Sequence, residues 1–249
     1  MTIIHAFFAF FAGALFASFA QLVADRIPTG TTIGGRSRCL ACGHPLGLLD
    51  VLPLFGYAVN RGRCRFCDAP IPRSHPVVEL VGGLLFSAVF LAFGGTLEAA
   101  VACIAIVVLL CESLLDIGSK TVSDRVWIAG SIPLIVIRII DGTILPHLLS
   151  AGLLFSILYL FALVGEKILK KEALGGGDVK LFAFIGFVLT WEAGLLALFF
   201  ASFLGFLFGI IRNRKGFALP FVPFIFAGVL IAHFAGAEII AWYLRLLGA

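Results

Sequence analysis

The sequence has few charged residues, and this scarcity excludes an ordinary soluble protein. Only 13% of its 249 residues are Asp, Glu, Lys or Arg, whereas 61% are hydrophobic. A soluble domain of this length keeps most of its outer shell in water and has too little interior to hide so much apolar surface. The composition therefore predicts a polytopic membrane protein, for which lipid is the solvent.

Basic residues are missing before the first apolar segment, Ile3–Leu22. A secretory signal peptide carries positive charge ahead of its apolar core, whereas here the first arginine, Arg26, follows it. Positive charge collects on the cytoplasmic side of membrane helices. We therefore expect an uncleaved transmembrane helix in residues 1–22, with its N-terminus outside the cytoplasm.

A second long polar region is missing after residue 76. Residues 23–76 form one polar stretch with four cysteines and seven arginines, and the rest of the chain is mostly apolar. We divide the chain into a first transmembrane helix (1–22), a cytoplasmic tetracysteine loop (23–76) and a transmembrane domain (77–249). The spans expected in this last domain are Val77–Phe93, Leu97–Leu115, Val126–Ile140, Leu148–Gly165, Leu181–Ile211 and Phe221–Leu244.

One of these apolar runs, Leu181–Ile211, is too long for a single crossing. About 20 apolar residues cross the hydrocarbon core as a helix. A turn at Trp191–Gly194 would divide the run into two segments, the first of them short. With this turn, the fold class is an all-α polytopic membrane protein of about eight transmembrane helices with a small zinc-ribbon-like cytoplasmic loop.

The same turn makes the distribution of basic residues one-sided. Of the 18 Lys and Arg residues, only Arg138 and Arg245 then fall on the opposite face. The positive-inside rule identifies the crowded face as cytoplasmic. The basic residues after the tetracysteine loop that define this face are Lys120, Arg125, Lys167, Lys170, Lys171, Lys180, Arg212, Arg214 and Lys215.

Four cysteines in the loop have the spacing of a metal site. Cys39 and Cys42 form one CxxC pair, and Cys64 and Cys67 form another. Two such pairs can supply four thiolates in a tetrahedron, the arrangement of structural zinc, and metal binding would then contribute much of the loop's folding free energy. An iron site and two disulfides are the alternatives, although the cytoplasm keeps thiols reduced.

Two aspartates stand at the edges of apolar spans. Asp116 follows the span that ends at Leu115, and Asp178 follows Gly175-Gly176-Gly177 directly before the next apolar run. A carboxylate at the bilayer edge is costly, and glycines allow another backbone to approach closely. Two adjoining carboxyl groups share one proton, so one can deprotonate water while the other protonates a carbonyl oxygen. This pattern favours an aspartic peptidase with Asp116 and Asp178 as the catalytic pair.

Several neighbours of these aspartates are candidates for supporting roles. Gly175 and Gly177 would shape the active-site loop. Lys180 would favour ionisation of a nearby carboxylate, meet the substrate backbone, or anchor the helix at the membrane surface. Glu112 lies one helical turn before Asp116. It would disfavour the ionisation of that aspartate, or it would be a polar residue whose hydrogen bonds are satisfied. Asp124 is a second-shell or structural candidate.

Other functions also fit the charge pattern alone. Asp116 and Asp124 could be solvated loop residues, with Asp178 capping a helix. A proton-coupled membrane transporter with a cytoplasmic zinc module uses acids at the membrane edge. A non-catalytic scaffold whose cysteine module docks a partner would tolerate loss of both aspartates.

The ordered set of motifs resembles one family over nearly the whole chain. Residues 36–67 are similar to its cytoplasmic cysteine module, and residues 175–180 look like its GxGDxK motif, with Asp116 at the position of its first catalytic aspartate. Pro220–Phe224 is similar to a PFGPF segment. The family is that of the bacterial prepilin leader peptidases, which are GxGD-type membrane aspartic proteases.

This resemblance implies a definite activity. An enzyme of this family removes the short basic leader from type IV prepilins or pseudopilins, after a glycine, at the cytoplasmic surface of the inner membrane. Many members with the cysteine module also methylate the new N-terminal residue with S-adenosylmethionine. This sequence departs from the family pattern at residues 17–21, at Leu48 and Leu49, and at Ser123.

Overall fold

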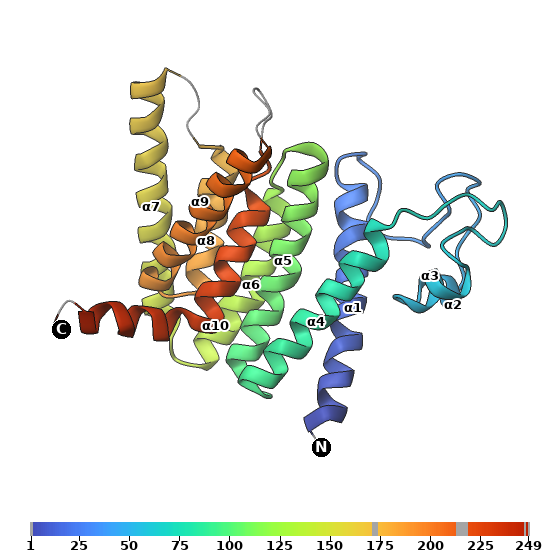
Figure 1. The fold of residues 1–249 in the computed structure, drawn as a ribbon, viewed down its shortest axis with the longest axis horizontal. Helices are drawn as coiled ribbons and strands as arrows, with labels where there is room; N and C mark the ends of the chain where they lie inside the picture. Colours follow the sequence, from blue (N-terminus) through green and yellow to red (C-terminus); the bar gives the residue numbers. More distant parts are fainter. Residues whose placement is uncertain (1, 171–173, 213–218, 247, 249) are drawn as a thin grey trace. The chain divides into compact units, whose positions relative to one another are not determined.

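The computed structural model describes residues 2–170, 174–212, 219–246 and 248, and most of these residues are helical (Figure 1). Apart from helices, the described part of the chain contains two isolated β-bridges. Three of the basic residues that define the expected cytoplasmic face, Lys171, Arg214 and Lys215, lie outside the described residues. The expected all-α fold class is confirmed.

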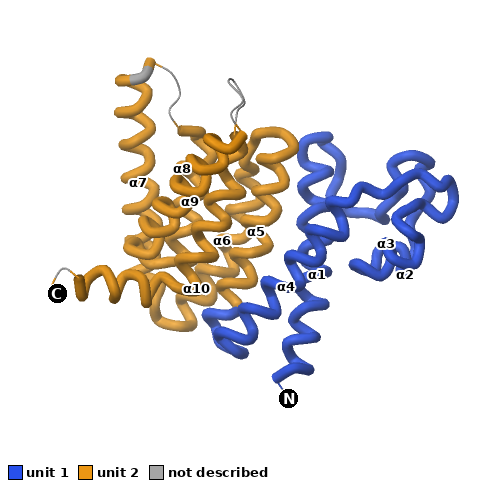
Figure 2. Tube along the Cα trace, in the orientation of Figure 1, with its two compact units in different colours: residues 1–99 blue, residues 100–249 orange. Residues whose placement is uncertain are grey.

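The chain folds into two compact units, residues 1–99 and residues 100–249 (Figure 2). In unit 1, α1 (Thr2–Arg26) packs along α4 (Ser74–Phe93), and the cysteine module between them contains the short helices α2 (Leu48–Val51) and α3 (Phe55–Val59). Glycine permits the close contact of α1 and α4, since a Cβ on Gly82 would lie 2.9 Å from the carbonyl oxygen of Gly13. Small residues commonly bring membrane helices together in this way.

Unit 2 is built around one short helix. The first helix of the unit, α5 (Leu97–Ser119), begins just before the unit boundary. The short helix α8 (Gly176–Val188) packs against α7 (Ile144–Leu169) and α6 (Asp124–Ile140), and buries Phe182 and Phe184 completely. Two further helices, α9 (Trp191–Arg212) and α10 (Val222–Leu246), pack against each other. A helix that is apolar on every side, like α8, is typical of a buried position.

The predicted division of the run Leu181–Ile211 is confirmed, although the break comes earlier than expected. The chain leaves α8 at Leu189, and α9 already begins at Trp191. Arg138, at the end of α6, donates from Nε to the Phe187 carbonyl at 3.0 Å and from Nη2 to the Val188 carbonyl at 2.9 Å. This buried guanidinium satisfies carbonyls that the end of a helix leaves without partners.

The expected count of about eight membrane-crossing helices is not confirmed. Among the described residues, six helices are long and apolar enough to cross a membrane: α1, α4, α5, α7, α9 and α10. The other two large helices, α6 and α8, have only 17 and 13 residues. The chain is therefore a multi-pass membrane protein with six candidate spans.

The contact between α9 and α10 depends on a glycine, which gives a test of the packing. A Cβ on Gly228 of α10 would overlap the carbonyl oxygen of Ala197 and lie 3.1 Å from the Ala201 nitrogen. We expect Gly228→Ala to destabilise the protein by about 1–3 kcal/mol, because the two backbones must separate. A thermal-shift assay in detergent measures this change. The matched control is Gly209→Ala in α9, where a Cβ meets nothing; an equal loss in both variants would contradict the packing argument.

Candidate active site and cysteine cluster

Asp116 lies in the last turn of α5 and is held by the beginning of α10. Its side chain is buried, and its Oδ2 accepts a hydrogen bond of 3.0 Å from the backbone N–H of Val222, the first residue of α10. The N-terminus of a helix offers free N–H groups and a positive dipole end to a carboxylate. The segment Pro220–Phe224 thus positions Asp116, a role that sequence reasoning missed because nothing in the sequence pairs these two distant segments.

Asp178 lies in the first turn of α8, where the glycines before it have distinct environments. A Cβ on Gly177 would lie 2.7 Å from the Cβ of Val122, so this glycine lets α8 approach the link between α5 and α6. A Cβ on Gly175 would lie 3.2 Å from the Asp178 carboxyl oxygen, whereas one on Gly176 would meet nothing. The half-buried Asp178 carboxyl group interacts electrostatically with Asp116.

Glu112 ties α5 to the beginning of α6. Its side chain is fully buried, and its Oε2 accepts a hydrogen bond of 2.9 Å from the backbone N–H of Ser123. Its Oε1 is buried without a hydrogen-bond partner among the described residues. Because Ser123 precedes α6, the Glu112 carboxyl group fixes where the link Lys120–Ser123 leaves α5, and Val122 in this link is the residue that Gly177 contacts.

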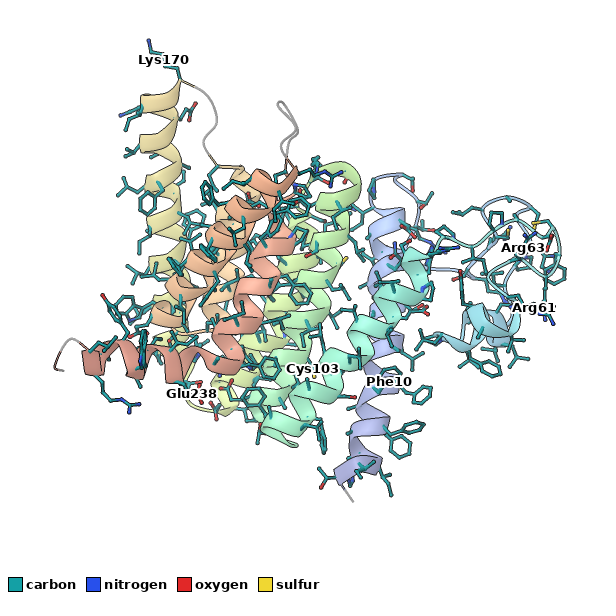
Figure 3. All side chains as sticks on the ribbon, in the orientation of Figure 1. Phe10, Arg61, Arg63, Cys103, Lys170 and Glu238 are labelled. Carbon is teal, nitrogen blue, oxygen red and sulfur yellow. The ribbon has the colours of Figure 1, made fainter. Side chains whose placement is uncertain are left out.

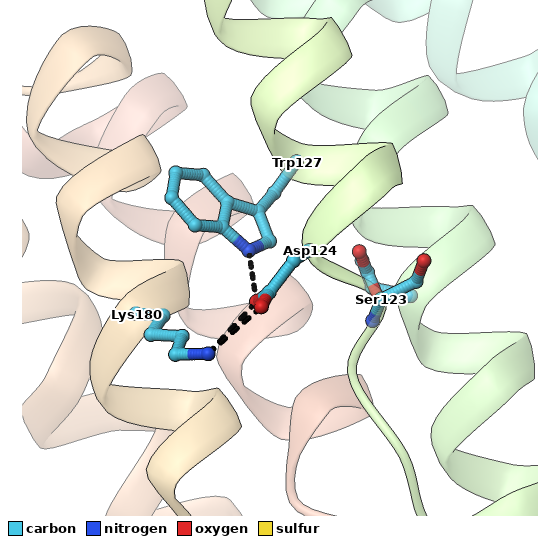
Figure 4. Close-up of polar contacts among 5 residues, drawn as sticks. Ser123, Asp124, Trp127 and Lys180 are labelled. Carbon is cyan, nitrogen blue, oxygen red and sulfur yellow. Dashed lines mark hydrogen bonds and ion pairs between the residues drawn. The ribbon is translucent and has the colours of Figure 1, made fainter.

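Lys180 and Asp124 form an ion pair between α8 and α6 (Figure 4). The Lys180 ammonium lies 2.8 Å from Oδ2 of Asp124, and the Trp127 indole N–H donates to Oδ1 at 3.1 Å. Both charged side chains are about half exposed, so the pair contributes little stability. Its geometry matters more, since it joins the first turn of α8 to the first turn of α6. Asp124 is a partner of Lys180 that the sequence did not predict.

These contacts gather one end of α5 and the starts of α6, α8 and α10 at the same end of unit 2. A cavity of about 300 Å³ lies beside this end, between α7 and the first turn of α8. Its lining is mostly apolar and includes two residues close to Asp178 in the chain, Gly176 and Val179. The other lining residues are Phe155, Tyr159, Ala162, Leu163, Glu166, Leu174 and Lys180. The turn of α8 that bears Asp178 thus borders this cavity.

The four cysteines of unit 1 form one cluster. The Sγ atoms of Cys39, Cys42, Cys64 and Cys67 all lie within 4.8 Å of one another, and those of Cys39 and Cys67 are 3.8 Å apart. In a tetrahedral zinc site with Zn–S bonds of about 2.3 Å, two sulfurs are about 3.8 Å apart. The cluster can therefore hold a metal ion, and all four cysteines are free thiols.

The two halves of the cluster repeat the same turn. In the first half, the Cys39 N–H donates to the His44 carbonyl at 2.9 Å, and the Gly43 N–H donates to the Cys39 carbonyl at 2.8 Å. In the second half, the bonds from Cys64 to Ala69 and from Asp68 to Cys64 have the same lengths. This repeated geometry explains the equal CxxC spacing, since each turn presents two sulfurs on one side.

The electrostatics of the cluster also suit a cation. The backbone N–H groups of Cys42 and Ala41 lower the pKa of the Cys39 thiol to about 6, so this cysteine supplies a thiolate near neutral pH. At Cys67 the Ala69 N–H acts in the same direction, but burial and the neighbouring thiols raise its pKa to about 12. Four sulfurs this close do not all ionise unless a positive charge lies between them.

The chain is similar to known proteins along most of its length. Residues 11–93 match the bacterial peptidase A24 N-terminal domain, and residues 103–210 match the type IV leader peptidase family. No solved structure matches the chain significantly.

Curated relatives of the chain carry the name prepilin leader peptidase/N-methyltransferase. The protein from Myxococcus xanthus is 35% identical over 84% of this chain, which spans 63% of that relative's length. The Bacillus subtilis protein is 32% identical over 95% of this chain and 97% of its own length, and the Aeromonas hydrophila protein is 31% identical over 84% and 74%. The chain belongs to the type IV leader peptidase family.

Proposed function

We propose that this protein is a membrane aspartic endopeptidase that cleaves the leader peptide of type IV prepilins or pseudopilins after a glycine. The observation that carries this proposal is that Asp116 and Asp178 lie at the same end of unit 2, where their carboxyl groups interact electrostatically and the turn that bears Asp178 borders a cavity. The names of the curated relatives support the substrate class. A proton-coupled transporter has no comparable support.

The pair of carboxyl groups supplies both proton transfers that peptide hydrolysis needs. Two adjoining carboxyl groups hold one proton between them. The ionised group takes a proton from water as the water oxygen attacks the peptide carbonyl carbon, and the protonated group gives its proton to the carbonyl oxygen. The tetrahedral intermediate then collapses: the amine nitrogen receives the proton taken from water and the C–N bond breaks. A hydroxyl group of the intermediate returns its proton to the carboxylate that had donated one, which restores the pair.

The active end of unit 2 faces the cytoplasm in this proposal. Lys120, Arg125 and Lys180 lie at that end, whereas Arg138 lies near the opposite end of α8. The positive-inside rule then orients the protein in the bacterial inner membrane with its N-terminus outside. In this orientation α6 and α8 would be two further membrane segments, giving eight.

The cysteine cluster would hold a structural zinc ion, and the protein would also methylate the new N-terminal residue. Zinc suits the cluster because four thiolates at tetrahedral spacing are its preferred structural site. The methylation rests on the relatives' name and would use S-adenosylmethionine as the methyl donor.

Replacing either carboxyl group by an amide tests the peptidase proposal. We expect Asp116→Asn and Asp178→Asn each to abolish leader removal from a prepilin-like peptide, because an amide neither takes nor gives the required proton. Mass spectrometry of the products records the position of the cut and any added methyl group. Asp141→Asn, in the loop between α6 and α7, is the matched control and should cleave normally. Normal cleavage by either site variant would contradict the assignment of Asp116 and Asp178 as the catalytic pair.

The contact of Gly177 with Val122 tests the geometry separately from the chemistry. We expect Gly177→Ala to lower kcat/KM for leader removal on the order of a hundredfold, since a shift of about 1 Å misplaces Asp178. Gly176→Ala, where the new Cβ meets nothing, is the matched control. The double variant Gly177→Ala/Val122→Gly removes the overlapping atom and should recover part of the activity. No recovery, or equal losses in both single variants, would contradict this role of Gly177.

The metal proposal is tested on the purified protein without any enzyme assay. Elemental analysis should find about one zinc per chain. Removing the metal with a chelator should make the loop of residues 27–73 sensitive to proteases while unit 2 stays intact, because metal binding contributes to the folding of this loop. A chain with less than stoichiometric metal and a protease-resistant loop would overturn the assignment.

A further inference from the structure

The segment between the two cysteine pairs is apolar and turned outward. Residues 46–59, named the apolar segment here, contain one charged residue, Asp50. They form α2 and α3, and their large side chains are exposed: Leu48 by 84%, Val59 by 60% and Phe55 by 53%, together with Leu49 and Leu52. An exposed apolar cluster of this kind marks an interaction surface.

The polar groups of the apolar segment face inward. The Asp50 side chain is only 6% exposed, and its Oδ2 accepts a hydrogen bond of 2.8 Å from the Gly47 N–H. The same oxygen lies 3.2 Å from the guanidinium of Arg65, and Asn60 donates to Oδ1 at 3.3 Å. The one charge of the segment is therefore neutralised and covered. A segment in contact with lipid must have its charges neutralised and covered in this way, whereas a segment in water need not.

A hydrogen bond fixes the apolar segment beside the membrane helices of unit 1. The Leu54 N–H donates to Oε2 of the buried Glu79 at 2.7 Å, and the Ser18 hydroxyl donates to Oε1 at 2.8 Å. At 1.5 Å per residue, Glu79 lies about 8 Å inside the start of α4, and Ser18 lies about 12 Å before the end of α1. Interfacial helices bury their apolar faces to a depth of about 5–10 Å, and Glu79, the partner of Leu54, lies within this distance of the start of α4.

Basic residues follow the apolar segment directly. Arg61, Arg63 and Arg65 follow α3, and Figure 3 labels the first two on this part of the chain. Arg63 pairs with Asp68 at 2.7 Å, and Arg65 pairs with Asp50. All three arginine side chains remain at least partly exposed. Anionic lipid headgroups attract basic residues at the membrane surface. An apolar face next to arginines matches the order of acyl chains and anionic headgroups across one leaflet.

We propose that the apolar segment is embedded in the membrane, with α2 and α3 at the boundary of acyl chains and headgroups and with anionic phospholipid as the partner. The cysteine module is then held by the bilayer itself as well as by α1 and α4. This surface is independent of the peptidase chemistry, and its test needs no substrate.

Fluorescence quenching by lipids tests the proposal on the full chain. The protein is placed in nanodiscs that contain one chain each and phosphatidylglycerol, with a doxyl group on the acyl chains as the quencher. We expect the fluorescence of the tryptophan introduced by Leu49→Trp to be quenched several-fold more strongly than that of the tryptophan introduced by Leu40→Trp. Leu40 lies between Cys39 and Cys42, outside the apolar segment, and is 95% exposed, so it controls for exposure alone. The three native tryptophans give the same background in both variants.

Val59→Trp provides a second reading in case Leu49→Trp does not fold, and it should be quenched like Leu49→Trp. Equal quenching at Leu40 and at the apolar segment would overturn the proposal. Quenching that is weak with one chain per disc, together with a blue-shifted emission only when two chains share a disc, would assign the surface to a second copy and also overturn it.

Discussion

The arrangement of the candidate site depends on the close approach of one helix backbone to one side chain. Gly177 lets the first turn of α8 lie against Val122, in the short link between α5 and α6. Glu112 fixes the end of this link at α6 by accepting a hydrogen bond from the Ser123 N–H. The ion pair of Lys180 with Asp124 joins the start of α8 to the start of α6. A side chain at position 177 would separate α8 from this link, and the carboxyl group of Asp178 would move with it. The contact is steric, so it selects glycine by size.

The shortness of α8 has its own physical basis. A helix of 13 residues that is buried on nearly every side must end inside an apolar layer, where unpaired carbonyls are costly. Arg138 satisfies the last carbonyls of α8 with two hydrogen bonds. At the end of unit 2 where α8 begins, the backbone N–H of Val222, the first residue of α10, donates to Asp116. These two contacts place polar groups of unit 2 where helices begin or end.

The sequence predicted the helices well because lipid imposes a simple rule of length and polarity. The expected spans from Val77–Phe93 to Phe221–Leu244 correspond to α4–α10, and the division of Leu181–Ile211 is confirmed. The position of the break was wrong by a few residues, since the chain leaves the helix at Leu189, and the predicted turn used the polar residues after it. The hydrogen bond from Val222 to Asp116 and the pairing of Lys180 with Asp124 could not be derived, because they join segments far apart in the chain. The outward face of the apolar segment was also missed, since a stretch between cysteine pairs was taken for a polar loop.

The central claim is that Asp116 and Asp178 face each other closely enough to share a proton. Cross-linking measures this directly in the membrane, with Asp116→Cys/Asp178→Cys treated with a short reagent that bridges two thiols, and Asp141→Cys/Asp178→Cys as the control. Mass spectrometry should find a bridged pair of peptides from α5 and α8 in the first double variant and none in the control. Two separately alkylated thiols at positions 116 and 178, without a bridge, would contradict the account.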